Sequence, residues 1–224
     1  LVLTNANGCS DSASIAVTVF IPPLAQIDST GPLAFCQGDS VVLRSVNPGN
    51  YQWYRNGTAI SSDSFVVAKQ GGTYSLVLTN ANGCSDSASV SVIVFSLPVA
   101  QIDSSGPLSF CSGDSVILRS ANSGNYQWFR NGAAVSTDSF ITVSTSGTYS
   151  LMLTNAKGCS DSASVSVTVF NLPVAQIDST GPLSFCSGDS VILRSANSGN
   201  YQWYRNGTAI STDSFVVATQ GGTY

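Results

Sequence analysis

A repeat of 75 residues organises this chain of 224 residues. Two series of cysteines advance along it in steps of 75 positions: Cys9, Cys84 and Cys159, and Cys36, Cys111 and Cys186. Residues 24–98 and 99–173 align without gaps and differ at about 21 positions, mostly by conservative exchanges. A period of this length predicts an array of like units, each of which contacts only its neighbours.

The alignment divides the chain into four segments. We expect residues 1–20 to be the C-terminal strands of a preceding unit, because they match 76–95. Complete units follow at 24–95 and 99–170, and the last unit, 174–224, is truncated before its final strands. The sequence is therefore expected to be a window cut from a longer array.

Each unit has the alternation of apolar and polar residues that is typical of β-strands, and helical periodicity is absent. The clearest example is NYQWYRNG at 50–57, which ends in an Asn-Gly turn signal. About seven strands per unit predict an all-β fold, a β-sandwich in each repeat. The first strand of this unit is expected at 25–29, broken by the Gly31-Pro32 turn signal and continued at 33–36. The others are expected at 40–46, 58–62, 64–68, 73–80 and 84–95.

One tryptophan per unit marks the expected core. A ring with this much apolar area, placed in the middle of a strand, is what a small sandwich packs its two sheets around. A tyrosine on the strand that follows Gly-Gly-Thr or Ser-Gly-Thr is expected to join it. The predicted core residues are Trp53, Trp128, Trp203, Tyr74 and Tyr149.

Composition argues against several classes of protein. Only 9% of the residues are charged, and a net charge of −4 with eight basic residues offers no cationic surface for nucleic acid. No apolar run approaches the ~20 residues that cross a bilayer, so we expect no membrane insertion in this segment. Histidine and glutamate are absent, and most catalytic and metal sites need them, so we expect no enzyme and no cofactor. The twelve acidic residues, all aspartates, lack the spacing of a calcium loop and are expected to cap turns.

Three motifs of the unit, GDSVVLRS, YQWYRNG and GGTYSLVLTN, resemble strands B, C and F of the immunoglobulin superfamily. The combined pattern, continued by TNAxGCSDSA, is similar to the Ig-like and PKD-like repeats of very large Bacteroidota surface proteins, which include gliding and adhesion proteins exported by type IX secretion. This resemblance implies an extracellular location at the cell surface. The chain departs from immunoglobulins at the inter-sheet cysteines, whose places are taken by Ser45 and Leu76.

All six cysteines are expected to form disulfides, because the chain has no Cys-x-x-Cys pair and no histidine. The first expectation is a bridge within each unit, Cys36–Cys84 and Cys111–Cys159. The strand directions of an immunoglobulin sandwich raise a difficulty, since they place these cysteines at opposite ends of one unit. The alternative joins neighbouring units through Cys36–Cys159, with Cys84 and Cys111 meeting cysteines outside this sequence.

The units meet at a Phe-x-x-Pro motif, as at Phe95 to Pro98, and these linkers contain no Gly/Ser run. Proline restricts the backbone, so we expect a stiff linker, although an ordinary domain link is the simpler interpretation. Asp-Ser-Ala resembles the O-glycosylation motif of Bacteroidota and would place glycans on Ser12, Ser87 and Ser162. The Asn-Gly-Thr sequences at 56 and 206 fit the N-glycan motif, and in a bacterial protein they would be turns only.

These observations predict a structural, non-catalytic segment of an extracellular rod, stalk or filament. Its partners would be neighbouring repeats of the same chain, with lateral self-association as a further possibility. The alternative is an adhesin module that binds glycans or surfaces directly, for which the candidates on the Trp strands are Tyr51, Tyr54, Tyr201 and Tyr204. The small, uniform turns argue against it, because they offer no cluster of Trp or Arg.

Overall fold

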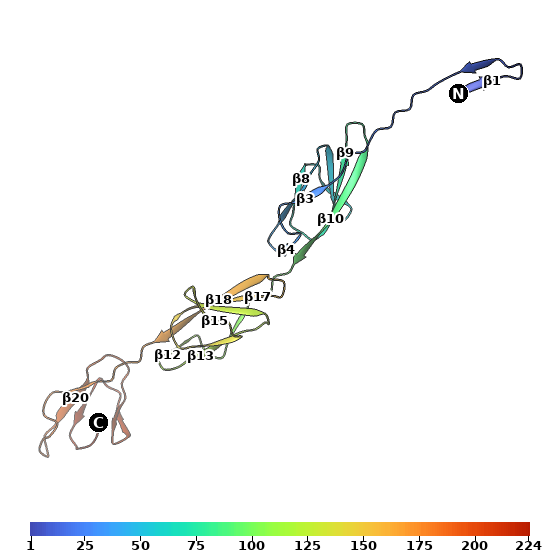
Figure 1. Ribbon diagram of the computed structural model, residues 1–224. Coiled ribbons are helices and arrows are strands. Elements are labelled where there is room, and N and C mark those ends of the chain that lie inside the picture. Colours follow the sequence, from blue (N-terminus) through green and yellow to red (C-terminus); the bar gives the residue numbers. More distant parts are fainter. The chain divides into compact units, whose positions relative to one another are not determined.

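The computed structural model describes residues 1–224 and contains strands and no helix (Figure 1). Contacts divide the chain into two compact units. The larger contains Leu1–Ser105, Ile117–Thr142 and Gly147–Ser166, and the smaller contains Gly106–Val116, Val143–Ser146 and Val167–Tyr224. The structure includes no helix long and apolar enough to cross a membrane.

The first strands form a hairpin and a complete sandwich. The hairpin consists of β1 (Val2–Thr4) and β2 (Ser10–Ser12). The strands of the sandwich are β3 (Ile27–Ser29), β4 (Ala34–Cys36), β5 (Val41–Ser45), β6 (Asn50–Arg55), β7 (Thr58–Ser61), β8 (Phe65–Ala68), β9 (Gly72–Thr79) and β10 (Ser85–Phe95).

These eight strands lie in two sheets with the orders β3-β5-β8 and β4-β10-β9-β6-β7. Every pairing is antiparallel except that of β4 with the end of β10, which is parallel. The first expected strand therefore divides at Gly31-Pro32, so that β3 pairs in one sheet and β4 in the other. This two-sheet order, with the tryptophan in the middle of β6, is that of an immunoglobulin-like β-sandwich.

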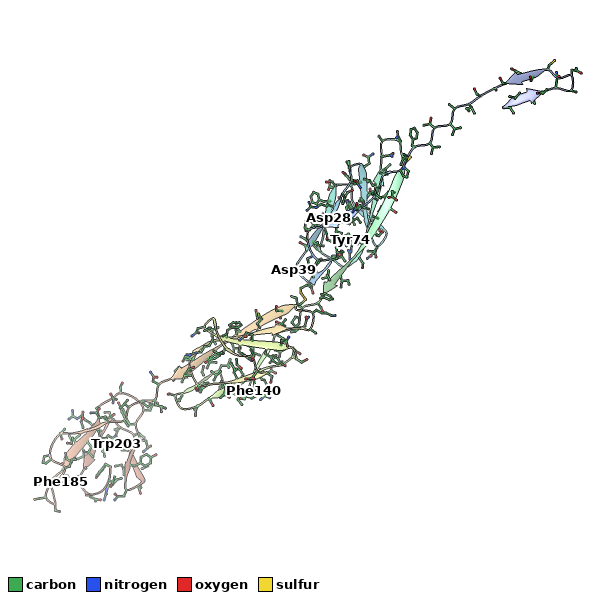
Figure 2. The ribbon with its side chains drawn as sticks, viewed as in Figure 1. Asp28, Asp39, Tyr74, Phe140, Phe185 and Trp203 are labelled. Atoms are coloured by element: carbon green, nitrogen blue, oxygen red, sulfur yellow. A yellow bond between two sulfur atoms is a disulfide. The ribbon has the colours of Figure 1, made fainter.

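The core of this sandwich surrounds Trp53, which is 0% exposed. The indole N–H donates a hydrogen bond to the carbonyl oxygen of Asp63 at 3.0 Å, so the one polar atom of the ring is satisfied. Tyr74 lies within the same sandwich (Figure 2), and its hydroxyl donates to the carbonyl oxygen of Gln70 at 2.9 Å. This bond is the tyrosine corner of immunoglobulin-like domains.

The inter-sheet position on β5 differs from the sequence prediction. Leu43, and not Ser45, is fully buried on this strand and belongs to the same apolar cluster as Trp53 and Leu76. The Ser45 hydroxyl is only part-buried and donates to the carbonyl oxygen of Asn47 at 2.8 Å. Aliphatic side chains therefore occupy both positions at which immunoglobulins place their core disulfide.

The second repeat has the same strand orders, β11-β13-β16 and β12-β18-β17-β14-β15. Its core residues Trp128 and Tyr149 are 0% and 4% exposed. The strands are β11 (Ile102–Ser104), β12 (Ser109–Cys111), β13 (Val116–Ser120), β14 (Asn125–Arg130), β15 (Ala133–Ser136), β16 (Phe140–Val143), β17 (Gly147–Thr154) and β18 (Ser160–Phe170).

The last segment forms two smaller sheets, β19-β20-β23 and β21-β22. No strand forms at Phe185, although the matching Phe35 lies in β4, because the partner corresponding to β10 is absent from the segment. Trp203 remains buried, at 6% exposure. The strands are β19 (Ile177–Ser179), β20 (Val191–Ser195), β21 (Trp203–Arg205), β22 (Thr208–Ser211) and β23 (Phe215–Ala218).

Candidate functional site at the junction of two repeats

A disulfide joins the first complete repeat to the second. It links Cys36 to Cys159, with 5.6 Å between the two Cα atoms and 123 residues between the cysteines in sequence. The cysteines that lie outside this bond carry free thiols: Cys9, Cys84, Cys111 and Cys186. The bond is therefore the alternative pairing weighed from the sequence.

The expected bridges within a repeat, Cys36–Cys84 and Cys111–Cys159, are wrong for a geometric reason. Cys84 directly precedes β10, whereas Cys36 pairs with Phe95 at the other end of that strand. A strand of 11 residues is about 36 Å long, and a disulfide tolerates a Cα separation of only about 4.4–6.8 Å. The same relation holds in the second repeat, where Cys111 pairs with Phe170 at the far end of β18.

Strand β4 pairs in parallel with the last residues of β10, and it therefore places Cys36 next to the C-terminal end of its repeat. Ala34, Phe35 and Cys36 pair with the last three residues of β10. The backbone N–H of Gln37 extends this pairing by donating to the carbonyl oxygen of Phe95 at 2.8 Å. The first residue of the linker to the next repeat follows Phe95 directly, so Cys36 lies beside the start of the linker. Figure 1 shows β4 next to the end of β10.

The turn of the β17–β18 hairpin positions Cys159. Its conformation is fixed by Asn155, whose side-chain oxygen accepts hydrogen bonds from the backbone N–H groups of Lys157 at 2.9 Å and Cys159 at 3.1 Å. The backbone N–H of Asn155 donates to the carbonyl oxygen of Cys159 at 2.9 Å. Cys159 is 1% exposed. Hydrogen bonds within the turn therefore hold the Cys159 sulfur in position at the junction.

The same hairpin binds the linker on both sides of Pro98. The side-chain N–H of Asn155 donates to the carbonyl oxygen of Ser96 at 3.0 Å. A carboxylate oxygen of Asp161 accepts from the backbone N–H of Ala100 at 2.9 Å. We call Asn155, Cys159 and Asp161 the junction triad, because all three side chains act on the linker or on the preceding repeat.

Two further contacts complete the junction. The side-chain N–H of Asn122 donates to the carbonyl oxygen of Val99 at 3.0 Å. The ammonium group of Lys157 lies 5.5 Å from the centroid of the Phe95 ring, within the range of a cation–π interaction. The backbone is thus bonded at Ser96 in the linker and at Val99 and Ala100, the first residues after it, in addition to the restriction that Pro98 imposes.

The preceding repeat carries the same triad at Asn80, Cys84 and Asp86. Asn80 donates to the carbonyl oxygen of Ile21 at 2.9 Å, and Asp86 accepts from the backbone N–H of Ala25 at 2.8 Å. The Cys84 sulfur is 3.8 Å from the carbonyl oxygen of Phe20, which is the counterpart of Phe95. This copy of the junction therefore has every polar contact of the triad and lacks only the second sulfur.

Sequence reasoning missed the Asn and Asp of the triad. The aspartates were expected to cap turns, and the asparagines were not singled out. Asn80 and Asn155 do fix their turns, but the contacts of these side chains with the linker were not predicted. The signal that could have revealed them is Asn-Ala-x-Gly-Cys-Ser-Asp, which recurs with fixed spacing in three copies and ends in a carboxylate that the turn itself does not need. In the first copy Asn5 makes the same turn, accepting from Asn7 and Cys9.

The other residues singled out from the sequence lie outside this site. Ser12, Ser87 and Ser162 are exposed on strands, next to aspartates of which two, Asp86 and Asp161, bind the linker. The tyrosines of the Trp strand divide as alternation predicts: Tyr51 packs against the apolar core, and Tyr54 lies on the opposite face of its strand. Tyr204, the counterpart of Tyr54, is half exposed, at 52%.

Comparisons with solved structures returned tandems of immunoglobulin domains. An I-band fragment of titin has 13% sequence identity and a TM-score of 0.42, with 87% of this chain and 83% of that chain covered. An ICAM-5 ectodomain fragment has 12% identity and a TM-score of 0.42, with coverage of 88% and 67%. The insect immune protein hemolin has 16% identity and a TM-score of 0.38, with coverage of 68% and 46%.

At these identities and scores the similarity says nothing about ligands or partners. No protein-family model matches the chain, and a search of curated proteins gave no match. The class is defined by the chain's own strand order, buried tryptophans and tyrosine corner: it is a tandem of immunoglobulin-like β-sandwiches.

Proposed function

We propose that this chain is a non-catalytic structural segment of an extracellular rod, stalk or filament. Its working parts are the sandwiches at 24–95 and 99–170, with 1–20 and 174–224 belonging to further repeats. Repetition of the sandwich sets the length of such a rod, and the junctions set its stiffness. The support comes from the junction, where a disulfide joins the two repeats, one hydrogen bond holds the linker at Ser96, and two more hold the first residues after it, Val99 and Ala100.

The Cys36–Cys159 bond is the observation that carries this proposal. A flexible tether between independent domains gains nothing from a covalent link across its linker, whereas a rod under bending or pulling does. Disulfides persist in oxidising compartments, which supports a location outside the cell. The resemblance to Bacteroidota surface repeats supports the cell surface and export by type IX secretion.

Small-angle X-ray scattering of the whole chain tests the rod. Three sandwiches in line, each about 36 Å long from its 11-residue strand, give a radius of gyration of about 30 Å. A compact globule of this chain length would give about 17 Å. The matched control is the double variant C36A/C159A, which we expect to broaden the distance distribution without making it compact. A value near 17 Å for the unaltered chain contradicts the proposal.

An adhesin module that binds glycans directly is the second candidate. It is favoured by the half-exposed Tyr204 alone, whose place is taken by Phe129 in the preceding repeat, so the hydroxyl is not a constant feature. A glycan array with the whole chain separates the two functions, because a structural segment is expected to bind no glycan. The O-glycan motifs at Ser12, Ser87 and Ser162 are tested by the intact mass of the native protein, in which each glycan adds to the sequence mass.

A further inference from the structure

We infer that Cys84 and Cys111 each form an inter-repeat disulfide of the Cys36–Cys159 kind. The partner of each is a cysteine of an adjoining repeat of the same sequence: a β4-type strand cysteine for Cys84 and a hairpin cysteine for Cys111. The inference rests on the proposed array, and it gives the array a covalent connection besides its main chain. Cys36 and Cys159 are the two members of the one bond that this chain closes within itself.

Cys111 has the backbone setting of Cys36. It pairs in parallel with Phe170, as Cys36 pairs with Phe95. The N–H of the following residue, Ser112, donates to the carbonyl oxygen of Phe170 at 2.8 Å, the distance found for the corresponding bond to Phe95. Cys111 is exposed, so its thiol is open to a partner. The partner that fits this setting is a hairpin cysteine of the Cys159 kind, 123 residues further along the chain.

Cys84 has the setting of Cys159. The turn that carries it is fixed by Asn80, whose side-chain oxygen accepts from the backbone N–H of Cys84 at 3.1 Å, as Asn155 does for Cys159. The Cys84 sulfur faces the carbonyl oxygen of Phe20. A strand of the β4 kind that paired with residues 18–20 would place its cysteine opposite Phe20, as Cys36 lies opposite Phe95.

The two halves are not interchangeable, which gives the bond a direction. The strand cysteine lies where a repeat ends and the hairpin cysteine lies where the next repeat begins, so each repeat offers one of each kind. In a junction of this geometry, a strand cysteine never lies next to another strand cysteine, and a hairpin cysteine never lies next to another hairpin cysteine. A series of such bonds therefore links every repeat to the one before it and the one after it, without branching.

Formation of the bond is an oxidation of two thiols. With oxidised glutathione as the oxidant, a thiolate attacks the glutathione disulfide and releases one reduced glutathione. The second thiolate then attacks the mixed disulfide and releases another. Two electrons and two protons pass from the cysteine pair to the glutathione. The hydrogen bonds of Asn80 and Asp86 to the linker are already in place without the bond, so they hold the hairpin thiol in position before oxidation.

Two extended chains test the inference. In the first, a copy of residues 150–170 follows Tyr224, which supplies the missing hairpin and its cysteine. In the second, a copy of residues 24–75 precedes Leu1, which supplies the missing β4-type strand. Each chain is oxidised with glutathione, alkylated with N-ethylmaleimide and mapped by mass spectrometry without reduction. The matched control of each carries serine in place of the added hairpin or β4-type cysteine.

We expect the first extension to link Cys111 to the added hairpin cysteine and to lower its alkylation at least tenfold. The second should do the same for Cys84 and the added strand cysteine, while the serine controls leave both thiols fully alkylated. Full alkylation of Cys111 and Cys84 in extended chains whose circular dichroism is that of folded β-structure overturns the inference. The Cys36–Cys159 peptide in the same maps separates the two failures. If the Cys36–Cys159 peptide is present while Cys111 and Cys84 stay free, only this inference is overturned. If that peptide is absent, the proposed disulfide-linked rod is overturned as well.

Discussion

Removal of the Cys36–Cys159 bond is expected to cost the chain several kcal/mol of stability. The perturbation is reduction of the unaltered chain, or the double variant C36A/C159A, which removes both thiols of the bond and leaves the other cysteines unchanged. A disulfide stabilises mainly by restricting the unfolded chain, and a closed loop of 123 residues corresponds to about 5 kcal/mol at 25 °C. If the first sandwich unfolds while the second stays folded, the loop shortens to roughly 60 residues. The loss is then about 4 kcal/mol, because the dependence on loop length is logarithmic.

Equilibrium unfolding in guanidinium chloride, followed by tryptophan fluorescence, measures this loss, since Trp53 and Trp128 report on the two sandwiches that the bond joins. The matched control is Cys84→Ala, which alters the same turn position in a repeat where no bond exists, and it should change stability by less than about 1 kcal/mol. Agreement between reduction and C36A/C159A excludes an effect of the alanines themselves. If C36A/C159A and Cys84→Ala lose the same amount, the loop-closure reasoning is refuted.

Two other predictions concern the sandwich itself. A Cβ added at Gly49 would lie 2.7 Å from the Leu78 side chain, so Gly49→Ala should cost about 1–3 kcal/mol in urea unfolding, whereas Gly199→Ala, with no atom within 4 Å, should leave stability unchanged. Equal effects of the two glycine variants would contradict the contact. Tyr74→Phe removes the hydrogen bond to the Gln70 carbonyl and should cost about 1 kcal/mol, measured as a lower midpoint with the same slope. A midpoint that does not move would mean that water replaces the hydroxyl.

Much of the fold could be predicted from the sequence, because alternation and the repeat are local properties. Every strand expected in the first unit lies within two residues of an observed one, and the Asn-Gly turn forms with Asn56 and Gly57 both at positive φ. The division of the first strand at Gly31-Pro32 was visible only as a turn signal. Which sheet each half joins depends on pairing partners some 15 to 60 residues away, and local patterns do not contain that information.

The junction was harder to predict because its residues also have simpler explanations. Asn155 and Asp161 belong to types that are common in turns, so nothing in the local pattern indicated that they bind the linker. The within-repeat disulfide was favoured by treating each unit as self-contained. The direction of the strands already argued against it, and the length of β10 shows why that argument was correct. Strand polarity was the better guide to cysteine pairing than proximity in sequence.

The disulfide also changes how the chain responds to a mechanical load. When tension is applied to Leu1 and Tyr224, the force crosses from Cys36 to Cys159 through the sulfur–sulfur bond. The segment between them then bears no load, even after its sandwiches have unfolded. Fully extended, a stretch of 123 residues would add roughly 400 Å of contour length. The chain cannot gain this length under tension until the disulfide is reduced. The oxidation state of a single cystine thus decides how far the molecule can be drawn out.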